Sequence, residues 1–284
     1  MFTFYKEHYD ELADLAVKAD MRRYLVEDEG AKHYIDIDQY ETALPLDTIC
    51  VSFDSAVSLF GLEYVHEHGV APWNLIRLKY ALTKAFERMD ESSIIRISAD
   101  LGHYVGDIHV PLHTHSNYNG QQTDQLGIHA LWESRLPEKF FEGYDLFNGS
   151  ASYWESVHDS IWKIIEESHA LVQRVFKEEL LTKNSLEESA RYTHELRNGK
   201  SFRNYSARYL RRYNSRLGDM VERRMRSAIR AAASLWFSAW VDAGQPSLEG
   251  VHGREFPKDI PLIDSTEGSQ ESARIEVSRR AKIH

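Results

Sequence analysis

The sequence VERRMRSAIRAAASLWFSAWVDAGQP, at residues 221–246, gives the clearest indication of how this chain folds. Its apolar residues recur at three- and four-residue steps or their sums, which places them on one face of an α-helix. They are Val221, Met225, Ala228, Ala232, Leu235 and Ala239. Gly244 and Pro246 form a normal helix-ending pair. The stretch therefore predicts a long helix with one buried face.

The same periodicity extends over most of the chain. Residues 151–181 carry a second apolar stripe that includes Ile161, Ile164 and Val175. Further helices are predicted at about 4–18, 52–68, 73–89, 91–108, 126–133 and 185–195. Alternating strand patterns are nearly absent, and HYIDID at 33–38 is the only clear short candidate. The sequence predicts an all-α fold.

Three stretches look irregular: 19–51, the Asn-, Gln- and Gly-rich segment 114–126, and the region beyond about 245. No linker divides the helical part, so a single domain over 1–263 is expected. The remaining residues, 264–284, lack an apolar pattern and are predicted to form a flexible tail.

The composition is that of an ordinary soluble protein, with 42% apolar and 27% charged residues, and it excludes full-length disorder. Lys and Arg number 34 against 44 Asp and Glu, a net charge of −10. This balance does not suggest tight nucleic-acid binding through phosphate neutralisation, although metal cations in a site would bind phosphates locally.

Several classes of protein are excluded by what the sequence lacks. Cys50 is the only cysteine, which excludes intrachain disulfides, thiolate zinc fingers and iron–sulfur clusters. The sequence shows no signal peptide and no run of 18 apolar residues, so stable membrane insertion is not expected. No obligate protein partner is evident.

The chemically informative segment is LGHYVGDIHVPLHTHSNYNGQQTDQLGIHALWESRLPE, residues 101–138. It holds two pairs of metal-type ligands at four-residue spacing, His103 with Asp107 and His129 with Glu133. This spacing places both members of a pair on one helix face, within reach of one ion. His113 lies between the pairs, after Pro111, which should end the first helix.

Imidazole and carboxylate ligands together suit zinc, since an all-oxygen calcium or magnesium cage would not use three histidines. One such pair alone is more typical of a solvated helix face. Two pairs with an intervening histidine favour a metal site, because burying so many polar groups without a metal would be costly.

The string HYVGDIHVPLH, residues 103–113, resembles the central motif of the superfamily that joins bacterial zinc-dependent phospholipases C with the S1/P1 nucleases. These are all-α enzymes with three clustered zinc ions. ADMRR (19–23) and HYIDID (33–38) resemble the segments that supply an Asp and a His to the first zinc. The resemblance implies that Asp20, His33, His103 and Asp107 bind one zinc, and that His113, His129 and Glu133 bind a second. Asp28 in VEDEG is the competing choice for Asp20.

The resemblance implies a zinc-dependent hydrolase of phosphodiester bonds that uses metal-activated water, with Asp20 and Asp107 as catalytic residues. GDIHVPLH is similar to the nucleases, whereas Glu133 and the short gap from His113 to His129 are more like the phospholipases. The motif leaves open whether the substrate is a phospholipid head group or single-stranded nucleic acid.

The N-terminus departs from the family pattern. In the family, an N-terminal Trp and a His five residues later bind the third zinc, but no Trp precedes Trp73 here. We therefore expect two zinc ions in this chain, and three if such a segment preceded it. The resemblance also implies a secreted or periplasmic protein in that case. The alternative function is a non-catalytic protein that is stabilised by zinc or binds a phosphate ligand.

Overall fold

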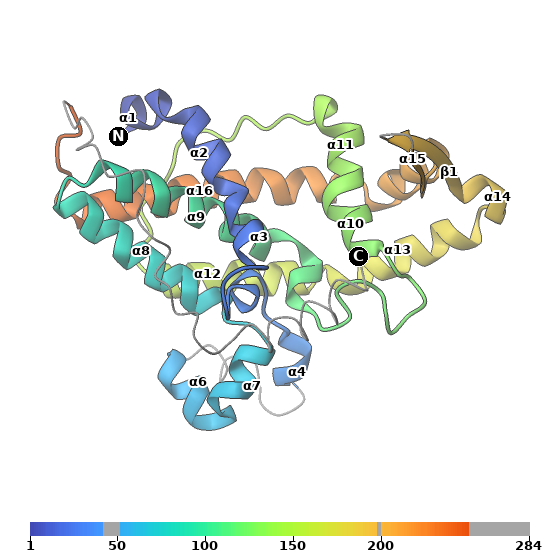
Figure 1. Ribbon diagram of the computed structural model, residues 1–284, viewed down its shortest axis with the longest axis horizontal. Helices are drawn as coiled ribbons and strands as arrows, with labels where there is room; N and C mark the ends of the chain where they lie inside the picture. The colour runs from blue at the N-terminus through green and yellow to red at the C-terminus, as the bar shows by residue number, and fades with distance from the viewer. Residues whose placement is uncertain (42–51, 198–199, 250–284) are drawn as a thin grey trace.

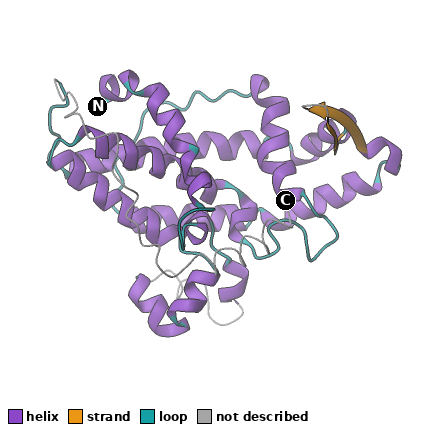
Figure 2. Ribbon diagram, viewed as in Figure 1, coloured by secondary structure: helices purple, strands orange, loops and turns teal. Residues whose placement is uncertain are grey.

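The computed structural model describes residues 1–41, 52–197 and 200–249 (Figure 1). Most of the described residues lie in helices, and one pair of strands is present among them (Figure 2). The all-α prediction is confirmed. None of the described helices is long and apolar enough to cross a membrane. The predicted single domain over 1–263 and the tail at 264–284 stay predictions, since residues 250–284 lie outside the described part.

Four long helices form the main body of the molecule and pack on one another. They are α8 (Ala71–Glu87), α9 (Glu91–His109), α12 (Val157–His169) and α16 (Met220–Asp242). Their apolar stripes meet in a core that contains the fully buried side chains of Leu82, Ile94, Leu101 and Leu235. Burial of such apolar area is the main term that stabilises a helical domain. The helix predicted from 221–246 is α16.

The N-terminal region covers one side of α9, against which α2 packs. The helix predicted at 4–18 consists of α1 (Phe2–Glu7), α2 (Tyr9–Ala16) and α3 (Lys18–Arg22), which follow one another with single-residue breaks. The helix predicted at 52–68 is likewise two helices, α6 (Phe53–Phe60) and α7 (Leu62–Glu67). Gly61 separates them with a φ of 88°, a conformation outside the helical region.

A second core lies at the other end of the molecule, on the right in Figure 1. The predicted helix over 151–181 begins only at Val157, as α12, and is interrupted near Leu171, so α13 (Val172–Asn184) is a separate element that runs into this end. It packs against α15 (Ala207–Leu217), which presents the buried rings of Tyr209 and Tyr213. The short helices α10 (Ile128–Ala130) and α11 (Leu136–Phe140) flank a π-helical turn, η3 (Leu131–Arg135).

The prediction of a helix over 185–195 is wrong beyond Arg191. Only α14 (Glu188–Arg191) is helical, and the chain continues as an antiparallel pair of strands, β1 (Tyr192–Arg197) and β2 (Lys200–Tyr205). The register pairs Tyr192 with Tyr205. Aromatic residues at strand ends and an Asn-Gly pair at 198–199 are typical of a two-residue hairpin, and this local signal outweighs the weak helical periodicity.

The strand suggested for HYIDID is also wrong. A 3-10 turn, η1 (Gly30–His33), ends at its first residue, and α4 (Ile37–Glu41) begins within it. The amide of Ile35 donates to the carbonyl of His113, at 2.9 Å, and none of the described strands pairs with this segment. Ile35 and Ile37 are fully buried, so their alternation reflects core packing rather than a sheet.

Candidate metal centre

The C-terminal half of α9 provides the first part of the site. The side chain of Asp90 accepts a hydrogen bond from the amide of Ser93 and so caps the start of this helix. The four-residue spacing then brings His103 and Asp107 to one face, as predicted. Val110 has extended backbone and Pro111 begins a new 3-10 turn, η2 (Pro111–Thr114), which carries His113. Pro111 ends the helix as expected from its missing amide hydrogen.

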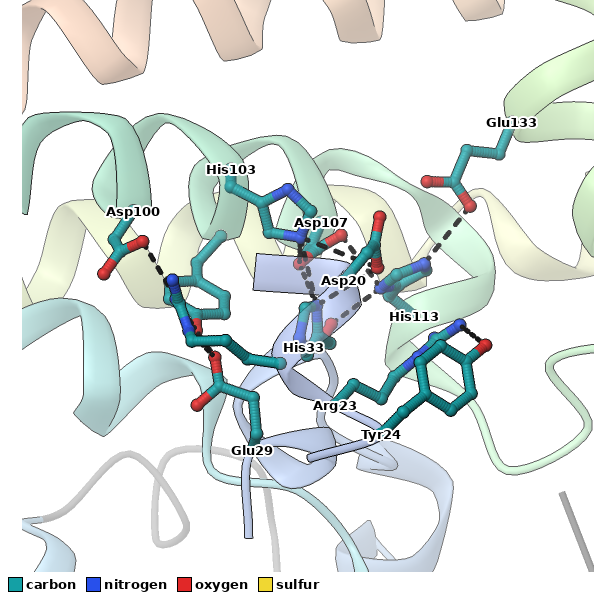
Figure 3. A network of polar contacts seen from close by, with 12 residues as sticks. Asp20, Arg23, Tyr24, Glu29, His33, Asp100, His103, Asp107, His113 and Glu133 are labelled. Carbon is teal, nitrogen blue, oxygen red and sulfur yellow. Dashed lines mark hydrogen bonds and ion pairs between the residues drawn. The ribbon is translucent and has the colours of Figure 1, made fainter. Parts of the chain in front are cut away.

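Two N-terminal elements face this end of α9. Asp20 lies on α3, and His33 is the last residue of η1. Figure 3 shows these two side chains directed toward His103 and Asp107. His33 and Asp107 are almost fully buried, whereas about half of the Asp20 side chain is exposed. The group therefore has one solvent-facing side, at Asp20.

Four side chains make up the first group. His33 Nδ1 lies 2.9 Å from Asp107 Oδ2 and 3.1 Å from His103 Nε2, and the latter two atoms are 3.3 Å apart. Asp20 Oδ1 lies 4.0 Å from His33 Nδ1 and 3.9 Å from His103 Nε2. A tetrahedral zinc with ligands at about 2.1 Å needs ligand atoms roughly 3.4 Å apart. The observed spacings bracket that value.

Three side chains make up the second group. His113 Nε2 lies 2.9 Å from His129 Nε2 and 3.4 Å from Glu133 Oε2, and His129 Nε2 lies 2.7 Å from the same oxygen. His129 is on α10, and Glu133 is in the π-helical turn η3. A set of two histidines and one glutamate leaves a fourth tetrahedral position open, which is the arrangement found in catalytic rather than structural zinc sites.

A hydrogen bond joins the two groups through the main chain. Nδ1 of His113 donates to the backbone carbonyl of His33, at 2.6 Å, which leaves Nε2 of His113 as the nitrogen that faces the second group. On the same side, Asp107 Oδ1 lies 3.6 Å from Nδ1 of His113. Such a bond to the far nitrogen commonly fixes the tautomer of a metal-binding histidine.

The protons of the second group cannot satisfy all its acceptors. In neutral His113 the proton is on Nδ1, where it is donated to the His33 carbonyl, so Nε2 can only accept a hydrogen bond. A proton on His129 Nε2 could be donated to His113 Nε2 or to Glu133 Oε2, but not to both. Burial alone would lower the pKa of His113, but the charges of Glu133 and Asp107 raise it to about 9. The arrangement favours a positive charge here, and a bound cation provides one. The residues therefore fit a metal ion.

The outer nitrogens of two other histidines show no such partner. Nε2 of His33 and Nδ1 of His129 are buried and form no hydrogen bond among the described residues. No hydrogen bond to the outer nitrogen therefore fixes the orientation of these two rings. Packing against neighbouring aromatic rings holds them instead. The ring of His33 packs edge-on against that of Tyr104.

The structure brings together all seven residues that the sequence pointed to, in the two sets expected. Asp28, the alternative to Asp20, is turned away: its carboxylate lies 3.6 Å from His66 Nδ1 and is mostly exposed. His109 is buried outside both groups, where it donates to the carbonyl of Val105 and contacts Ser227. That the seven side chains bind metal stays a prediction.

Sequence reasoning missed a charged network that holds the N-terminal elements against α9. The buried carboxylate of Glu29 accepts hydrogen bonds from Arg22 Nε at 3.0 Å, Lys32 Nζ at 2.5 Å and Tyr104 Oη at 2.5 Å. Arg22 also donates to Asp100, at 2.9 Å (Figure 3). Arg22 and Asp100 are 78 residues apart in sequence, and no motif or periodicity signals such a pair.

Comparison with known proteins gives a limited match. No family model matches the chain. The chain is 25% identical over 145 residues to Nuclease S1 of Aspergillus oryzae, a match that covers 48% of this chain. The chain spans 45% of the length of that relative. The similarity supports a distant relationship to nucleases of the S1/P1 type, in agreement with the resemblance of the central motif.

Proposed function

We propose that this protein is a zinc-dependent phosphodiesterase of the nuclease type. The observation that carries the proposal is the convergence of two nitrogen and oxygen donor sets, joined through His113 and the His33 carbonyl. The similarity to Nuclease S1 favours the nuclease branch over the phospholipase branch, which the motif had left open.

In this proposal Asp20, His33, His103 and Asp107 hold one zinc ion, and His113, His129 and Glu133 hold another. Zinc ions at these positions would supply Lewis acidity toward phosphate oxygens and make water more acidic. Asp20, the most exposed member of its group, would accept a hydrogen bond from the attacking water and orient it toward phosphorus. Asp107 would keep His33 and His103 in place, since its Oδ2 contacts both rings.

Side chains next to Asp20 provide a surface for the substrate. Arg23 and Tyr24 follow on the same segment, and Arg23 donates to the Tyr24 hydroxyl at 3.1 Å (Figure 3). About half of Tyr24 is exposed. An exposed aromatic ring stacks readily on an unpaired base, and a guanidinium beside it contacts phosphate. These features suit a nucleotide at the entrance.

Hydrolysis by the zinc-loaded protein tests the proposal. Asp20→Asn should lower the rate on a single-stranded oligodeoxynucleotide and on bis(p-nitrophenyl) phosphate at least about tenfold, or about 1.4 kcal/mol in the barrier. The matched control is Asp28→Asn, which removes an exposed carboxylate from the same segment and should leave the rate unchanged.

Three outcomes would contradict the proposal. Equal losses in both variants would reject Asp20 as the metal-binding carboxylate. Release of phosphocholine from phosphatidylcholine, without cleavage of the oligonucleotide, would identify a phospholipase instead. A protein that retains zinc but hydrolyses none of these substrates would support the non-catalytic alternative.

A further inference from the structure

A strongly basic segment stands out in this acidic chain. Residues 196–218, LRNGKSFRNYSARYLRRYNSRLG, contain seven Lys and Arg residues and no Asp or Glu, although the whole chain has a net charge of −10. The negative net charge of the whole chain does not reveal this local excess of positive charge. The segment covers most of the hairpin and the whole of α15, at one end of the molecule (Figure 1).

The helix α15 separates its arginines from its apolar residues. Arg208, Arg211 and Arg212 lie at three- and four-residue steps and are exposed. Tyr209 and Tyr213 occupy the opposite face and are buried against α13. We name the exposed set of Arg208, Arg211 and Arg212 the α15 arginine face.

The α15 arginine face has no carboxylate partner among the described residues, and no hydrogen bond to its side chains is present there. Some arginines elsewhere differ: Arg22 pairs with Glu29 and Arg226 pairs with Asp145. Like charges at helical neighbour positions destabilise a helix by roughly 0.2–0.5 kcal/mol per pair. A polyanion laid along the face would remove that repulsion.

A hollow in the surface adjoins this face. It has a volume of about 290 Å³, and its lining includes Arg191, Arg208, Asn184 and Ser185 together with the carboxylate-bearing Glu187. Arg191 uses Nε to donate to the carbonyl of Leu186, at 2.9 Å, and this bond fixes the guanidinium beside the hollow. Two guanidiniums with amide and hydroxyl groups form a suitable environment for a phosphate group.

The hairpin, which leads into α15, carries one half-exposed aromatic ring and one ring that is covered by an arginine. About half of Phe202 is exposed, and the guanidinium of Arg203 lies 3.6 Å from the centre of the Tyr192 ring. Exposed rings can stack on bases only where the bases are unpaired, so this surface suits a single strand better than a duplex.

The hairpin and α15 pack against elements that carry part of the candidate metal centre. The hydroxyl of Tyr205, at the end of β2, lies within 3.6 Å of the position that a Cβ on Gly127 would occupy. Gly127 is two residues from His129 and precedes α10. In addition, α15 contacts α11, which follows the turn that carries Glu133. The hairpin and α15 are therefore near the group that contains His129.

We infer that the α15 arginine face, with Arg191 and Phe202, is a second binding surface for the backbone of single-stranded nucleic acid, outside the metal centre. The inference rests on the proposed function, since the strand held here would be the substrate strand. One or two nucleotides would occupy the centre, and the phosphates beyond them would contact the arginines.

Binding measured without cleavage tests the surface apart from catalysis. A fluorescent 20-nucleotide oligodeoxythymidylate is titrated with the full chain in EDTA, and Kd is taken from anisotropy over a series of salt concentrations. The triple variant Arg208→Gln, Arg211→Gln, Arg212→Gln should weaken binding at least about tenfold. The slope of log Kd against log salt should fall by about 2, because each phosphate contact on a single strand contributes about 0.7.

The matched control removes three exposed cations elsewhere: Arg88→Gln, Lys163→Gln, Arg230→Gln. It should change Kd less than about twofold and leave the slope unchanged. In zinc-loaded protein, the arginine variant should raise KM for the oligonucleotide and leave hydrolysis of bis(p-nitrophenyl) phosphate at the wild-type rate, since that substrate has a single phosphate.

Equal weakening in the control variant would overturn the inference, since it would show an effect of net charge alone. An unchanged Kd in the arginine variant would also overturn it. So would a preference for phosphatidylserine vesicles over the oligonucleotide, which would identify a membrane-binding face. Loss of binding in the arginine variant, in a protein that hydrolyses no phosphodiester, would retain the surface and reject the proposed function.

Discussion

Replacing Glu29 by Gln should destabilise the fold by an amount that depends on pH. Burial of this carboxylate alone would raise its pKa, but the hydrogen bonds from Lys32 and Tyr104 and the charges of Lys32 and Arg22 lower it from 4.5 to about 2. A fall of that size corresponds to roughly 3 kcal/mol of stabilisation of the ionised form at neutral pH. Gln would retain one acceptor oxygen, so we expect Glu29→Gln to lower the free energy of unfolding by about 2 kcal/mol.

The sign of the pH dependence follows from the lowered pKa. Because Glu29 binds its proton less tightly in the folded state, its contribution is fully present above about pH 4.5. The contribution falls as the pH drops and is lost as the pH passes through about 2. The difference in unfolding free energy between wild type and Glu29→Gln should therefore be constant from about pH 7 to about pH 5 and shrink below about pH 4.5.

Urea unfolding followed by circular dichroism, in EDTA to remove bound metal, measures this difference. Glu27→Gln is the matched control, since Glu27 is exposed two residues away and should change stability by less than about 0.5 kcal/mol. If Glu29→Gln lowered the free energy of unfolding by less than about 0.5 kcal/mol, the reasoning would be refuted. A loss that stays constant down to about pH 3 would also refute it, since such a loss would reflect packing rather than charge.

Three further predictions concern the centre and its loop. Elemental analysis of protein refolded with zinc should find two zinc ions per chain, and a content below one would reject both groups as zinc sites. Asp107→Asn should abolish hydrolysis while Glu133→Gln leaves more residual rate, because Asp107 contacts both histidines of its group; equal losses would contradict this. Gly120→Ala should lower the free energy of unfolding by about 3 kcal/mol, because Gly120 has a φ of 73° and a Cβ there would lie 2.3 Å from the carbonyl of Gln125. Gly120→Ala should also weaken zinc binding in the group that contains His129, and an unchanged melting temperature would show that the loop accommodates the methyl group.

The helical fold and the two donor sets were predictable because each rests on spacing within a short stretch. The stripe from Val221 to Ala239 needs only the helical period, and the pairs His103–Asp107 and His129–Glu133 need only one turn of helix. The resemblance added Asp20 and His33, which no spacing rule connects to α9.

Features that depend on distant parts of the chain were not predictable. Two contacts form only after α3 and η1 pack on α9. They are the ion pair of Arg22 with Asp100 and the hydrogen bond that the Tyr104 hydroxyl donates to Glu29. The strands β1 and β2 differ from the predicted helix because the helical periodicity there is weak and the Asn-Gly pair in the sequence favours a hairpin. The basic segment, by contrast, is local: the run RYLRR at 208–212 can be read directly from the sequence as a solvated helix face.

The hydrogen bond from His113 Nδ1 to the His33 carbonyl has a thermodynamic consequence for metal uptake. An ion bound in either group would fix the residue at one end of this hydrogen bond. The other group would then lose less conformational entropy when it binds its own ion. The two sites would then fill cooperatively, and linkage requires that each raises the affinity of the other by the same factor. A titration with zinc would give a steeper curve than two independent sites, and removing a ligand from one group would weaken binding in both.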